Sequence, residues 1–303
     1  MSSTSPQSAL VTATYSRRMT ILLEDSTVVE ARIKGKKLRP VCGDRVVAER
    51  ITNEAEWLIT AVDPRDNELT RPDSRGRKDV LAANLSCVVV MAAFEPEPDW
   101  FVVDRYIAAA ENMGANAIVV FNKADLPNDW QPVSDTLADY RSAGYDVIEC
   151  SAVSGQNLDE LERALAAEVA IIVGQSGVGK SSVINRIVED AAQKVGALSR
   201  ASREGRHTTV NSIMHEMAGG GRVIDSPGVR DYAPAIDTAD EVIGGFREIN
   251  VKGLDCRFAN CRHLREPGCA VKRAVDDGDI SPRRYESFKR LMVLTRDLAE
   301  RRR

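Results

Sequence analysis

The 303-residue sequence lacks several features that mark whole classes of protein. It has no uninterrupted apolar run of about 18 residues, the length that a membrane-spanning helix needs. Residues 1–8 lack the charged-then-apolar order of a signal peptide. Glycine and proline are modest, at 20 and 12 residues, which excludes collagen-like and low-complexity chains. We therefore expect a cytoplasmic protein of two or three domains with no membrane partner.

A strong net charge is also missing, because 41 Lys and Arg residues nearly balance 45 Asp and Glu residues. The total of −4 gives no sign of a nucleic-acid binder. The distribution is uneven, however: residues 31–40 hold five basic side chains and no acid, and residues 71–78 hold four bases and one acid. Such runs are either solvated faces or parts of a binding surface, and charge alone leaves both open.

Cysteine is sparse, and its six copies are unevenly placed. Cys42, Cys87 and Cys150 are isolated and predicted to be small buried or surface residues. The remaining three share a window of 14 residues with a histidine: Cys256, Cys261, His263 and Cys269. Three thiolates and one imidazole suit a closed tetrahedral Zn²⁺ site with a structural role. We expect one Zn²⁺ per chain, whose loss would loosen the C-terminal domain but leave nucleotide affinity nearly intact. The alternative is four side chains packed without metal.

The apolar pattern changes twice along the chain. Residues 15–62 contain short β-rich runs that suit a small barrel of about five strands. From residue 85, apolar runs alternate with helical stretches, as in βαβ units around a parallel sheet. From residue 239, helical patterns flank the cysteines. The predicted domains are residues 1–80, 81–236 and 237–303. Strands are expected at 27–33, 44–48, 57–61, 86–93, 117–121, 146–149, 169–173 and 223–224, and helices at 99–113, 157–167 and 282–303.

A phosphate-binding loop is predicted at residues 174–182, GQSGVGKSS. It follows an apolar strand and opens a helix, which is the context that the mechanism requires. Glycines let backbone N–H groups wrap the phosphates, and the helix N-terminus adds positive potential. Lys180 would reach the β- and γ-phosphates, and the Ser181 hydroxyl would ligate Mg²⁺. The predicted contacts are Gly174, Gln175, Ser176, Gly177, Val178, Gly179, Lys180, Ser181 and Ser182.

The residues Asn122, Lys123, Ala124 and Asp125 indicate which base is bound. They follow an apolar strand, where the Asp125 carboxylate can accept hydrogen bonds from the N1–H and N2–H₂ groups of guanine. This complementarity discriminates strongly, because the wrong base leaves buried polar groups unpaired. Without a phosphate loop the same pattern would also fit a cap and turn. After the next strand, a backbone N–H of Ser151 or Ala152 could support the guanine carbonyl.

Two later segments supply candidates for Mg²⁺ and the γ-phosphate. Asp225, in the sequence DSPG, fits a carboxylate that holds Mg²⁺ through water, and the Gly228 N–H fits a γ-phosphate contact. The loop GRHTT at 205–209 offers Thr209, with Thr208 as the alternative. The predicted magnesium residues are therefore Ser181, Thr209 and Asp225.

The order of these motifs is unusual. Ordinary P-loop GTPases carry the phosphate loop first and Asn-Lys-x-Asp last, whereas here the guanine motif at 122 precedes the phosphate loop at 174. The chain therefore looks like a circularly permuted GTPase. Such a rearrangement is tolerable because domain termini usually lie at the surface and often near one another.

Over nearly its full length the sequence resembles the RsgA (YjeQ) family of bacterial small-ribosomal-subunit biogenesis GTPases. The resemblance is carried by VCGDRVV at 41–47, LTRPDSRGRKDVL at 69–81, the motifs at 122, 174, 205 and 225, and residues 256–271. It implies an N-terminal OB-fold barrel, a central circularly permuted α/β GTPase domain and a C-terminal α-helical zinc-binding domain. It also implies GTP hydrolysis stimulated by the small ribosomal subunit, a role in late subunit maturation, and contacts with ribosomal RNA.

The residue that orients the hydrolytic water is not the usual one. Val229 occupies the position where Ras-like enzymes carry a glutamine, and it has no polar group. Of the three histidines, His263 is assigned to the metal and His215 lies in an apolar run. His207 is therefore the candidate, a role that the resemblance also implies, and with Lys180 it forms the predicted catalytic pair. A surface histidine in a flexible loop is the alternative.

The expected partners are GTP and GDP, the small ribosomal subunit and its RNA, and we expect a monomer. The basic part of an RNA surface is present at Arg32, Lys34, Lys36, Lys37 and Arg39. Aromatic residues are few there, since residues 10–80 hold only Tyr15 and Trp57, so backbone and shape recognition is expected over base stacking. Two other classes stay open: a GTP-gated RNA-binding switch that scarcely turns over, and a zinc-dependent nucleic-acid binder with a P-loop kinase or ATPase engine.

Overall fold

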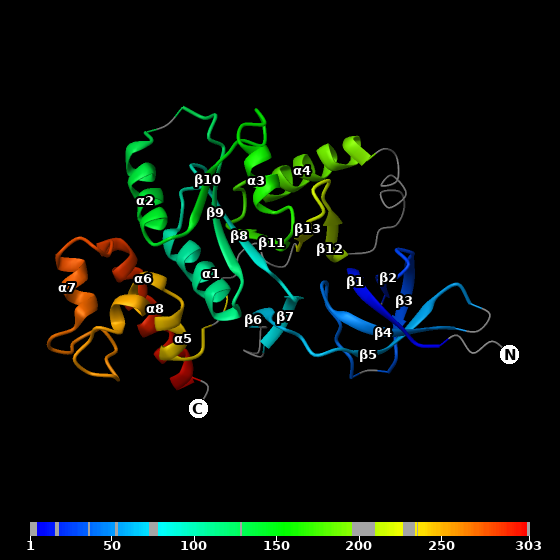
Figure 1. The fold of residues 1–303 in the computed structure, drawn as a ribbon, viewed down its shortest axis with the longest axis horizontal. Coiled ribbons are helices and arrows are strands. Elements are labelled where there is room, and N and C mark those ends of the chain that lie inside the picture. The colour runs from blue at the N-terminus through cyan, green and yellow to red at the C-terminus, as the bar shows by residue number, and fades with distance from the viewer. Residues whose placement is uncertain are drawn as a thin grey trace. The chain divides into compact units, whose positions relative to one another are not determined.

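The computed structural model describes residues 5–15, 18–35, 37–51, 54–72, 78–127, 129–195, 210–226, 234 and 236–301 (Figure 1). The chain forms two compact units. The first comprises Met1–Ser86, Leu158–Ile172 and Lys180–Asp231. The second comprises Cys87–Asn157, Val173–Gly179 and Tyr232–Arg303.

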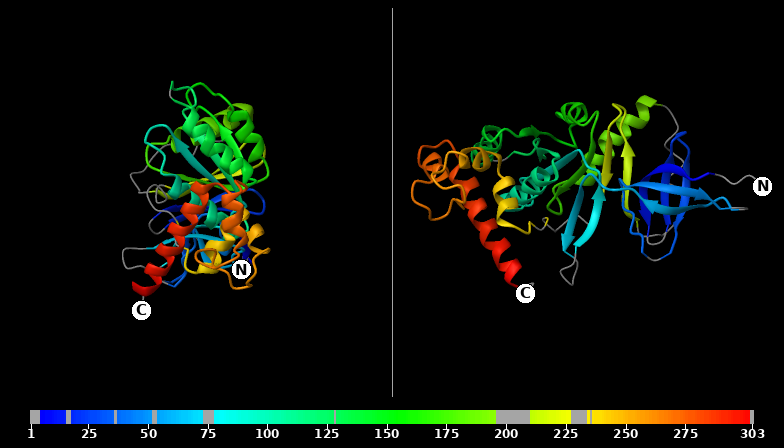
Figure 2. Two further views of the ribbon diagram at one scale, coloured as in Figure 1. Left: turned by 90° about the vertical axis from the view of Figure 1, so that its left-hand side faces the viewer. Right: turned by 60° about the horizontal axis from the view of Figure 1, so that its bottom comes forward.

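Five strands of the first unit close into a small barrel, drawn in blue in Figures 1 and 2. They are β1 (Gln7–Tyr15), β2 (Arg18–Leu23), β3 (Val28–Ile33), β4 (Arg45–Arg50) and β5 (Trp57–Val62). Their order is β1-β2-β3-β5-β4, and β4 pairs back with β1, so the sheet closes on itself. The pair β3–β5 is parallel and the other pairs are antiparallel. The predicted N-terminal barrel is confirmed.

The barrel interior is filled by alternating side chains, as the pleat of a strand requires. Val11, Ile21 and Ile59 are fully buried there. β1 begins at Gln7, earlier than the expected start of the barrel near residue 15. Two of the residues that β1 buries, Ala9 and Ala13, have small side chains with little strand preference, so the sequence gives only a weak signal for this strand.

The rest of the first unit continues from the barrel. A hairpin of β6 (Glu68–Pro72) and β7 (Lys78–Ala83) forms a separate two-stranded sheet. The other elements are α3 (Leu158–Ala164), β11 (Val169–Gly174), α4 (Lys180–Val195), β12 (Val210–Glu216) and β13 (Arg222–Asp225). The last two residues of β11, Val173 and Gly174, belong to the second unit. β11 runs parallel to β13, β13 antiparallel to β12, and β12 antiparallel to β1.

The second unit contains a parallel sheet in the order β10-β9-β8, from β8 (Cys87–Ala93), β9 (Asn116–Asn122) and β10 (Asp146–Glu149). Every residue of β8 is buried, as expected for a strand covered on both faces. Helix α1 (Trp100–Met113) lies between β8 and β9 in the chain, and α2 (Gln131–Ser142) between β9 and β10. The predicted strands of this region are confirmed.

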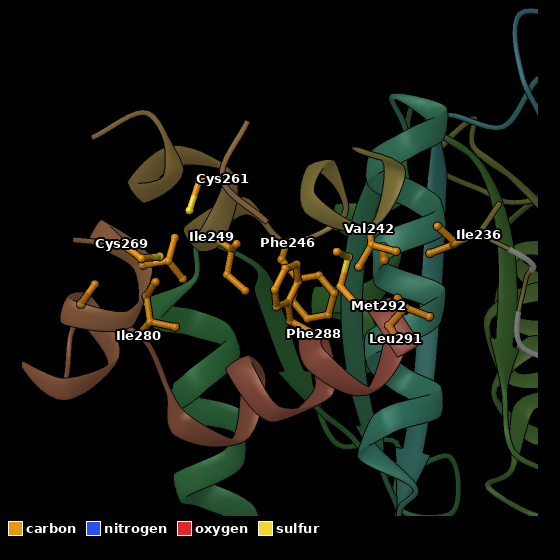
Figure 3. Packing of buried hydrophobic residues seen from close by; sticks show 13 residues of the cluster. Ile236, Val242, Phe246, Ile249, Cys261, Cys269, Ile280, Phe288, Leu291 and Met292 are labelled. Atoms are coloured by element: carbon orange, nitrogen blue, oxygen red, sulfur yellow. The ribbon is translucent and has the colours of Figure 1, made fainter. Parts of the chain in front are cut away.

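The C-terminal part of the second unit is helical: α5 (Ala239–Gly244), α6 (Arg247–Gly253), α7 (Ala270–Asp276) and α8 (Pro282–Arg301). Their apolar side chains form one core, in which the rings of Phe246 and Phe288 meet edge to face at 5.7 Å (Figure 3). Ala108 of α1 belongs to the same core. No helix among the described residues is both long and apolar enough to cross a membrane.

Helix α2 is absent from the predicted elements. Its start carries no side-chain cap, because Trp130 occupies the cap position and makes no capping hydrogen bond. Its buried residues Val133, Leu137 and Tyr140 nevertheless follow helical spacing. The sequence signal for the start of α2 is thus limited to Pro132 in its first turn, without a capping side chain.

Candidate functional site

Asn122, the first residue of the guanine motif, holds three loops of the second unit together. Its side chain is only 2% exposed. Its amide nitrogen donates to the carbonyl of Val178 at 2.9 Å, and its amide oxygen accepts from the N–H of Ala152 at 3.2 Å. Both polar ends of a buried amide are thus satisfied by the other two loops. Three segments predicted to bind one nucleotide therefore lie side by side: residues 122–125, 151–152 and 174–179.

Two glycines of the phosphate loop are required by close approaches. At Gly179, where φ is +94°, an added Cβ would lie 2.3 Å from the amide nitrogen of Asn122. At Gly174, where φ is +137°, an added Cβ would lie 2.2 Å from the carbonyl oxygen of Met91. Only glycine combines these backbone angles with such proximity. The loop conformation therefore depends on its sequence in the way that the motif predicts.

The predicted base-reading residue, Asp125, lies in an exposed turn directly after β9. The turn is closed by a hydrogen bond from the N–H of Leu126 to the carbonyl of Lys123 at 3.1 Å. Lys123 has a φ of +64°, and its ammonium group donates to the carbonyl of Glu95. The carboxylate of Asp125 is thus accessible to a base.

The backbone N–H groups of Ser151 and Ala152, predicted to be available to guanine, both have hydrogen-bond partners in the structure. The Ser151 N–H donates to the carbonyl of Gln156 at 3.1 Å, and the Ala152 N–H donates to Asn122. A guanine carbonyl would therefore share the Ala152 N–H with Asn122. Bifurcated bonds of this kind occur in proteins.

In the first unit, Lys180, Ser181 and Ser182 begin α4, and the two serines are exposed. The first turn of α4 contains no acidic residue, so its own side chains do not neutralise the positive helix end. Asp225 ends β13. Because the preceding residue pairs in register with Ile171 of the parallel strand β11, Asp225 lies at the carboxyl end of that pair. Ligands of open α/β sheets bind at such ends.

Four predicted residues fall outside the described residues: His207, Thr208, Thr209 and Gly228. The catalytic role of His207, the magnesium role of Thr209 and the γ-phosphate contact of Gly228 stay predictions.

Cys256, Cys261, His263 and Cys269 converge, with their ligand atoms all within 4.8 Å of one another. The Nδ1 atom of His263 lies 3.5 Å from the Cys256 sulfur and 3.6 Å from the Cys269 sulfur, and these sulfurs are 3.9 Å apart. A tetrahedral zinc ion, with bonds of about 2.3 Å to sulfur and about 2.0 Å to nitrogen, would space two sulfurs by about 3.8 Å and a sulfur and nitrogen by about 3.5 Å. The cluster fits a tetrahedral metal ion.

Burial and hydrogen bonds around the Cys/His cluster affect the protonation and placement of its side chains. Burial lowers the pKa of His263, which favours the neutral imidazole that metals bind. Its carbonyl accepts the hydroxyl of Tyr285 at 2.7 Å. Burial raises the pKa of Cys261 to about 12, and a bound cation would reverse this by stabilising the thiolate. The metal loop is further organised by Glu266, whose carboxylate accepts the N–H groups of Arg262, Leu264 and Arg265.

The basic residues predicted for the RNA surface of the barrel differ in whether an acidic side chain pairs with them. Arg32 pairs with Glu54 and Glu56. Lys34, Lys37 and Arg39 are exposed and, within the described part of the chain, form no ion pair with an acid. Lys36 lies outside the described residues. Of the basic residues predicted for the RNA surface, those described without an acidic partner therefore lie on the connection between β3 and β4.

Together, the closed barrel, the parallel sheet, the loops joined by Asn122 and the order of the motifs define a circularly permuted P-loop GTPase. The profile of the RsgA GTPase family matches residues 62–234. A protein of Azotobacter vinelandii named small ribosomal subunit biogenesis GTPase RsgA is 39% identical over 293 residues, which covers 95% of this chain and 85% of that protein. A Haemophilus influenzae protein of the same name is 36% identical over 291 residues, covering 94% and 84%.

Two solved structures are similar over almost the whole chain. The crystal structure of YjeQ from Thermotoga maritima aligns with a TM-score of 0.75 and 26% identity, covering 96% of this chain and 99% of that one. The structure of YloQ, described as a circularly permuted GTPase, aligns with the same score and identity, covering 97% and 96%. The chain belongs to the RsgA GTPase family. It is accordingly a GTP hydrolase, and the family implies Mg²⁺ with the nucleotide.

Proposed function

We propose that the protein binds the small ribosomal subunit, hydrolyses GTP in response to that binding, and acts in late maturation of the subunit. The observation that supports this most directly is the joining of the guanine motif, the 151–152 loop and the phosphate loop by Asn122, in a chain 39% identical to a protein named small ribosomal subunit biogenesis GTPase. We further propose that the protein acts in the cytoplasm as a monomer.

In the proposed mechanism, the N–H groups of the phosphate loop and the Lys180 ammonium bind the phosphates and stabilise charge that develops in the transition state. Ser181, Thr209 and Asp225 would hold Mg²⁺, which supplies further charge neutralisation when bound. Gly228 would contact the γ-phosphate. Because Val229 cannot orient water, His207 takes that role.

Hydrolysis measured with and without purified small ribosomal subunits tests this proposal. We expect slow basal turnover and strong stimulation by the subunit. The His207→Ala variant should bind GTP and subunits but lose most of the stimulated rate. Absence of stimulation in the wild-type protein would favour a GTP-gated RNA-binding switch, and full stimulation in the variant would remove His207 from the mechanism.

Base selectivity tests the guanine site separately. Asp125→Asn replaces an acceptor by a donor, so preference should shift from GTP toward xanthosine triphosphate. Asp129→Asn, a change at another exposed carboxylate four residues on, is the matched control and should keep GTP selectivity. Unaltered selectivity in Asp125→Asn would show that the base binds elsewhere.

For the metal, we propose one Zn²⁺ per chain, held by Cys256, Cys261, His263 and Cys269. The donor set and the separations of Nδ1 and the sulfurs support zinc over harder cations, which prefer oxygen ligands. Elemental analysis of purified protein should find about one zinc per chain, and Cys261→Ala should lose it. A wild-type preparation without metal, and with the same melting curve after chelation, would contradict the assignment.

For the RNA contact, we propose that Lys34, Lys37 and Arg39 bind phosphates of ribosomal RNA. Their lack of acidic partners among the described residues supports them over Arg32, whose charge is already compensated. Changing Lys34 and Lys37 to Gln should weaken subunit binding and reduce its salt dependence, whereas Arg32→Gln should change both less. Equal effects would point to another surface.

A further inference from the structure

A short segment of the second unit, residues 95–99, supports both nucleotide loops. From the guanine motif, the Lys123 ammonium donates to the carbonyl of Glu95. From the phosphate loop, the side-chain amide of Gln175 accepts the N–H of Asp99 at 2.8 Å and donates to the carbonyl of Glu97 at 3.2 Å. The same five residues are therefore anchored to the loop that reads the base and to the loop that wraps the phosphates.

Asp99 connects this segment rigidly to helix α1. While its backbone N–H binds Gln175, its carboxylate caps the helix by accepting the N–H groups of Phe101 at 3.0 Å and Val102 at 3.2 Å. One residue thus belongs to both the helix cap and the loop contact. A displacement of α1 would move the partner to which Gln175 is bound.

Helix α1 is in turn fixed by a buried ionic network from α8. The Asp104 carboxylate, fully buried, accepts Arg284 at 2.7 Å on one oxygen and Arg283 at 2.9 Å on the other. Burial disfavours the charge of this carboxylate, but the two guanidinium groups outweigh it and hold the pKa of Asp104 below its usual range. Arg284 is 1% exposed and also binds Glu248 of α6 through two hydrogen bonds.

Apolar packing joins the same helices. Ala108 of α1 lies in one core with Phe288 of α8 and with the metal ligands Cys261 and Cys269. Helix α5 ends against α1 so closely that a Cβ added to Gly245 would lie 2.5 Å from the Cβ of Ala108. With so little space, α1 cannot shift without moving the C-terminal helices.

We propose that Arg283 and Arg284 are positioning residues for the guanine nucleotide: they hold α1, α1 holds residues 95–99, and this segment holds Gln175 and Lys123. The C-terminal helices thereby set how tightly the nucleotide loops retain their ligand. This inference rests on the proposed function only in taking those loops as the guanine nucleotide site. It also reverses the expectation that loss of the metal leaves nucleotide affinity nearly intact, because the metal ligands share the core of these helices.

The test is the dissociation rate of a fluorescent GDP analogue from the full-length protein. Arg284→Met should release GDP about tenfold faster, within the range usual for coupled sites. Arg296→Met removes an exposed arginine from the same helix and should leave the rate unchanged. Because Arg284→Met removes a fully buried charge and can prevent folding, Arg283→Met, at a residue 26% exposed, is measured beside it.

A double variant separates positioning from general destabilisation. Gln175→Ala alone should speed GDP release, since it cuts the phosphate loop from residues 95–99. Because Arg283 is proposed to act in part through Gln175, the double variant Arg283→Met, Gln175→Ala should release GDP more slowly than the product of the two single effects would give. Multiplied rates in the double variant, or a folded Arg283→Met protein with the wild-type rate, would overturn the proposal. Failure of the wild-type protein to bind the GDP analogue at all would instead overturn the proposed nucleotide site.

Discussion

Two ionic networks of this chain contrast in what surrounds them. On the barrel, Arg32 pairs with Glu54, and their side chains are 45% and 48% exposed. In the second unit, Asp104 and Arg284 pair at 0% and 1% exposure. Water and salt screen the first pair and can replace either partner, whereas only protein groups satisfy the second. The exposed ion pair on the barrel can therefore be lost at little cost, whereas the buried ion pair is needed to hold helices α1 and α8 together.

The difference in stability between the two networks is tested most directly by removing one arginine from each. Arg284→Met leaves the charges of Asp104 and Glu248 buried, so it should lower the free energy of unfolding of the second unit by about 3–5 kcal/mol. Arg32→Met should cost under about 1 kcal/mol. Denaturant unfolding followed by tryptophan fluorescence measures both, because Trp100 and Trp130 report on the second unit and Trp57 on the barrel. Similar losses in the two variants would abolish the distinction.

Glu266 is intermediate in burial between the two ionic networks, so its contribution to stability should be intermediate as well. Burial works against its charge, but backbone N–H groups outweigh it and lower the pKa of Glu266 to about 2. A lowered pKa in the folded state means that the stabilisation is complete above the unfolded value of about 4.3 and is lost as the pH falls toward 2. Since Glu266 is half-buried and still reaches solvent, Glu266→Gln should cost only about 1 kcal/mol at pH 7.

The pH dependence is the measurement that decides this case. The difference in unfolding free energy between wild type and Glu266→Gln should be constant from pH 7 to 5 and shrink by pH 3. Glu286→Gln, at an exposed carboxylate paired with Lys289, serves as the control and should show a small difference throughout. A Glu266 difference that persists undiminished at pH 3 would mean that the hydrogen bonds of the loop do not depend on its charge.

The smallest expected effect sharpens the comparison from the barrel side. Glu54→Gln should change the unfolding free energy by less than about 1 kcal/mol at low salt, and the change should approach zero in 1 M salt, where the screening length is about 3 Å. A salt-independent loss would show that this exposed pair is held by more than Coulomb attraction.

What could be predicted from the sequence follows the same division between local and distant contacts. The phosphate loop, the guanine motif and the Cys/His cluster are each set by residues close together in the chain, and glycines such as Gly174 and Gly179 mark their backbone requirements. The sequence also predicted a helix at 282–303, where the structure has α8. The burial of Arg284 in this helix was not predicted. Its partner Asp104 is 180 residues away in the sequence, so no local pattern indicates the pair.

The roles of Asn122 and Gln175 were invisible for a related reason. Both were predicted as members of nucleotide-binding motifs, which is all that the spacing of those motifs indicates. That Asn122 joins three loops, and that Gln175 turns to the segment before α1, depends on how separate strands bring their ends together. Such contacts come from packing of the sheet, which no local pattern encodes.

The separation of Asp104 and Arg284 also has a consequence for the order of synthesis. A ribosome adds roughly 5–20 residues each second, so about 10–35 s pass between the appearance of the carboxylate and that of its guanidinium partner. During this interval the nascent carboxylate lacks the two guanidinium groups that compensate its charge in the folded protein. Helix α8 is translated long after α1 and the guanine motif, and it completes the unit that contains both. Under our proposal, a chain released before α8 would carry the nucleotide loops without the support of Arg283 and Arg284.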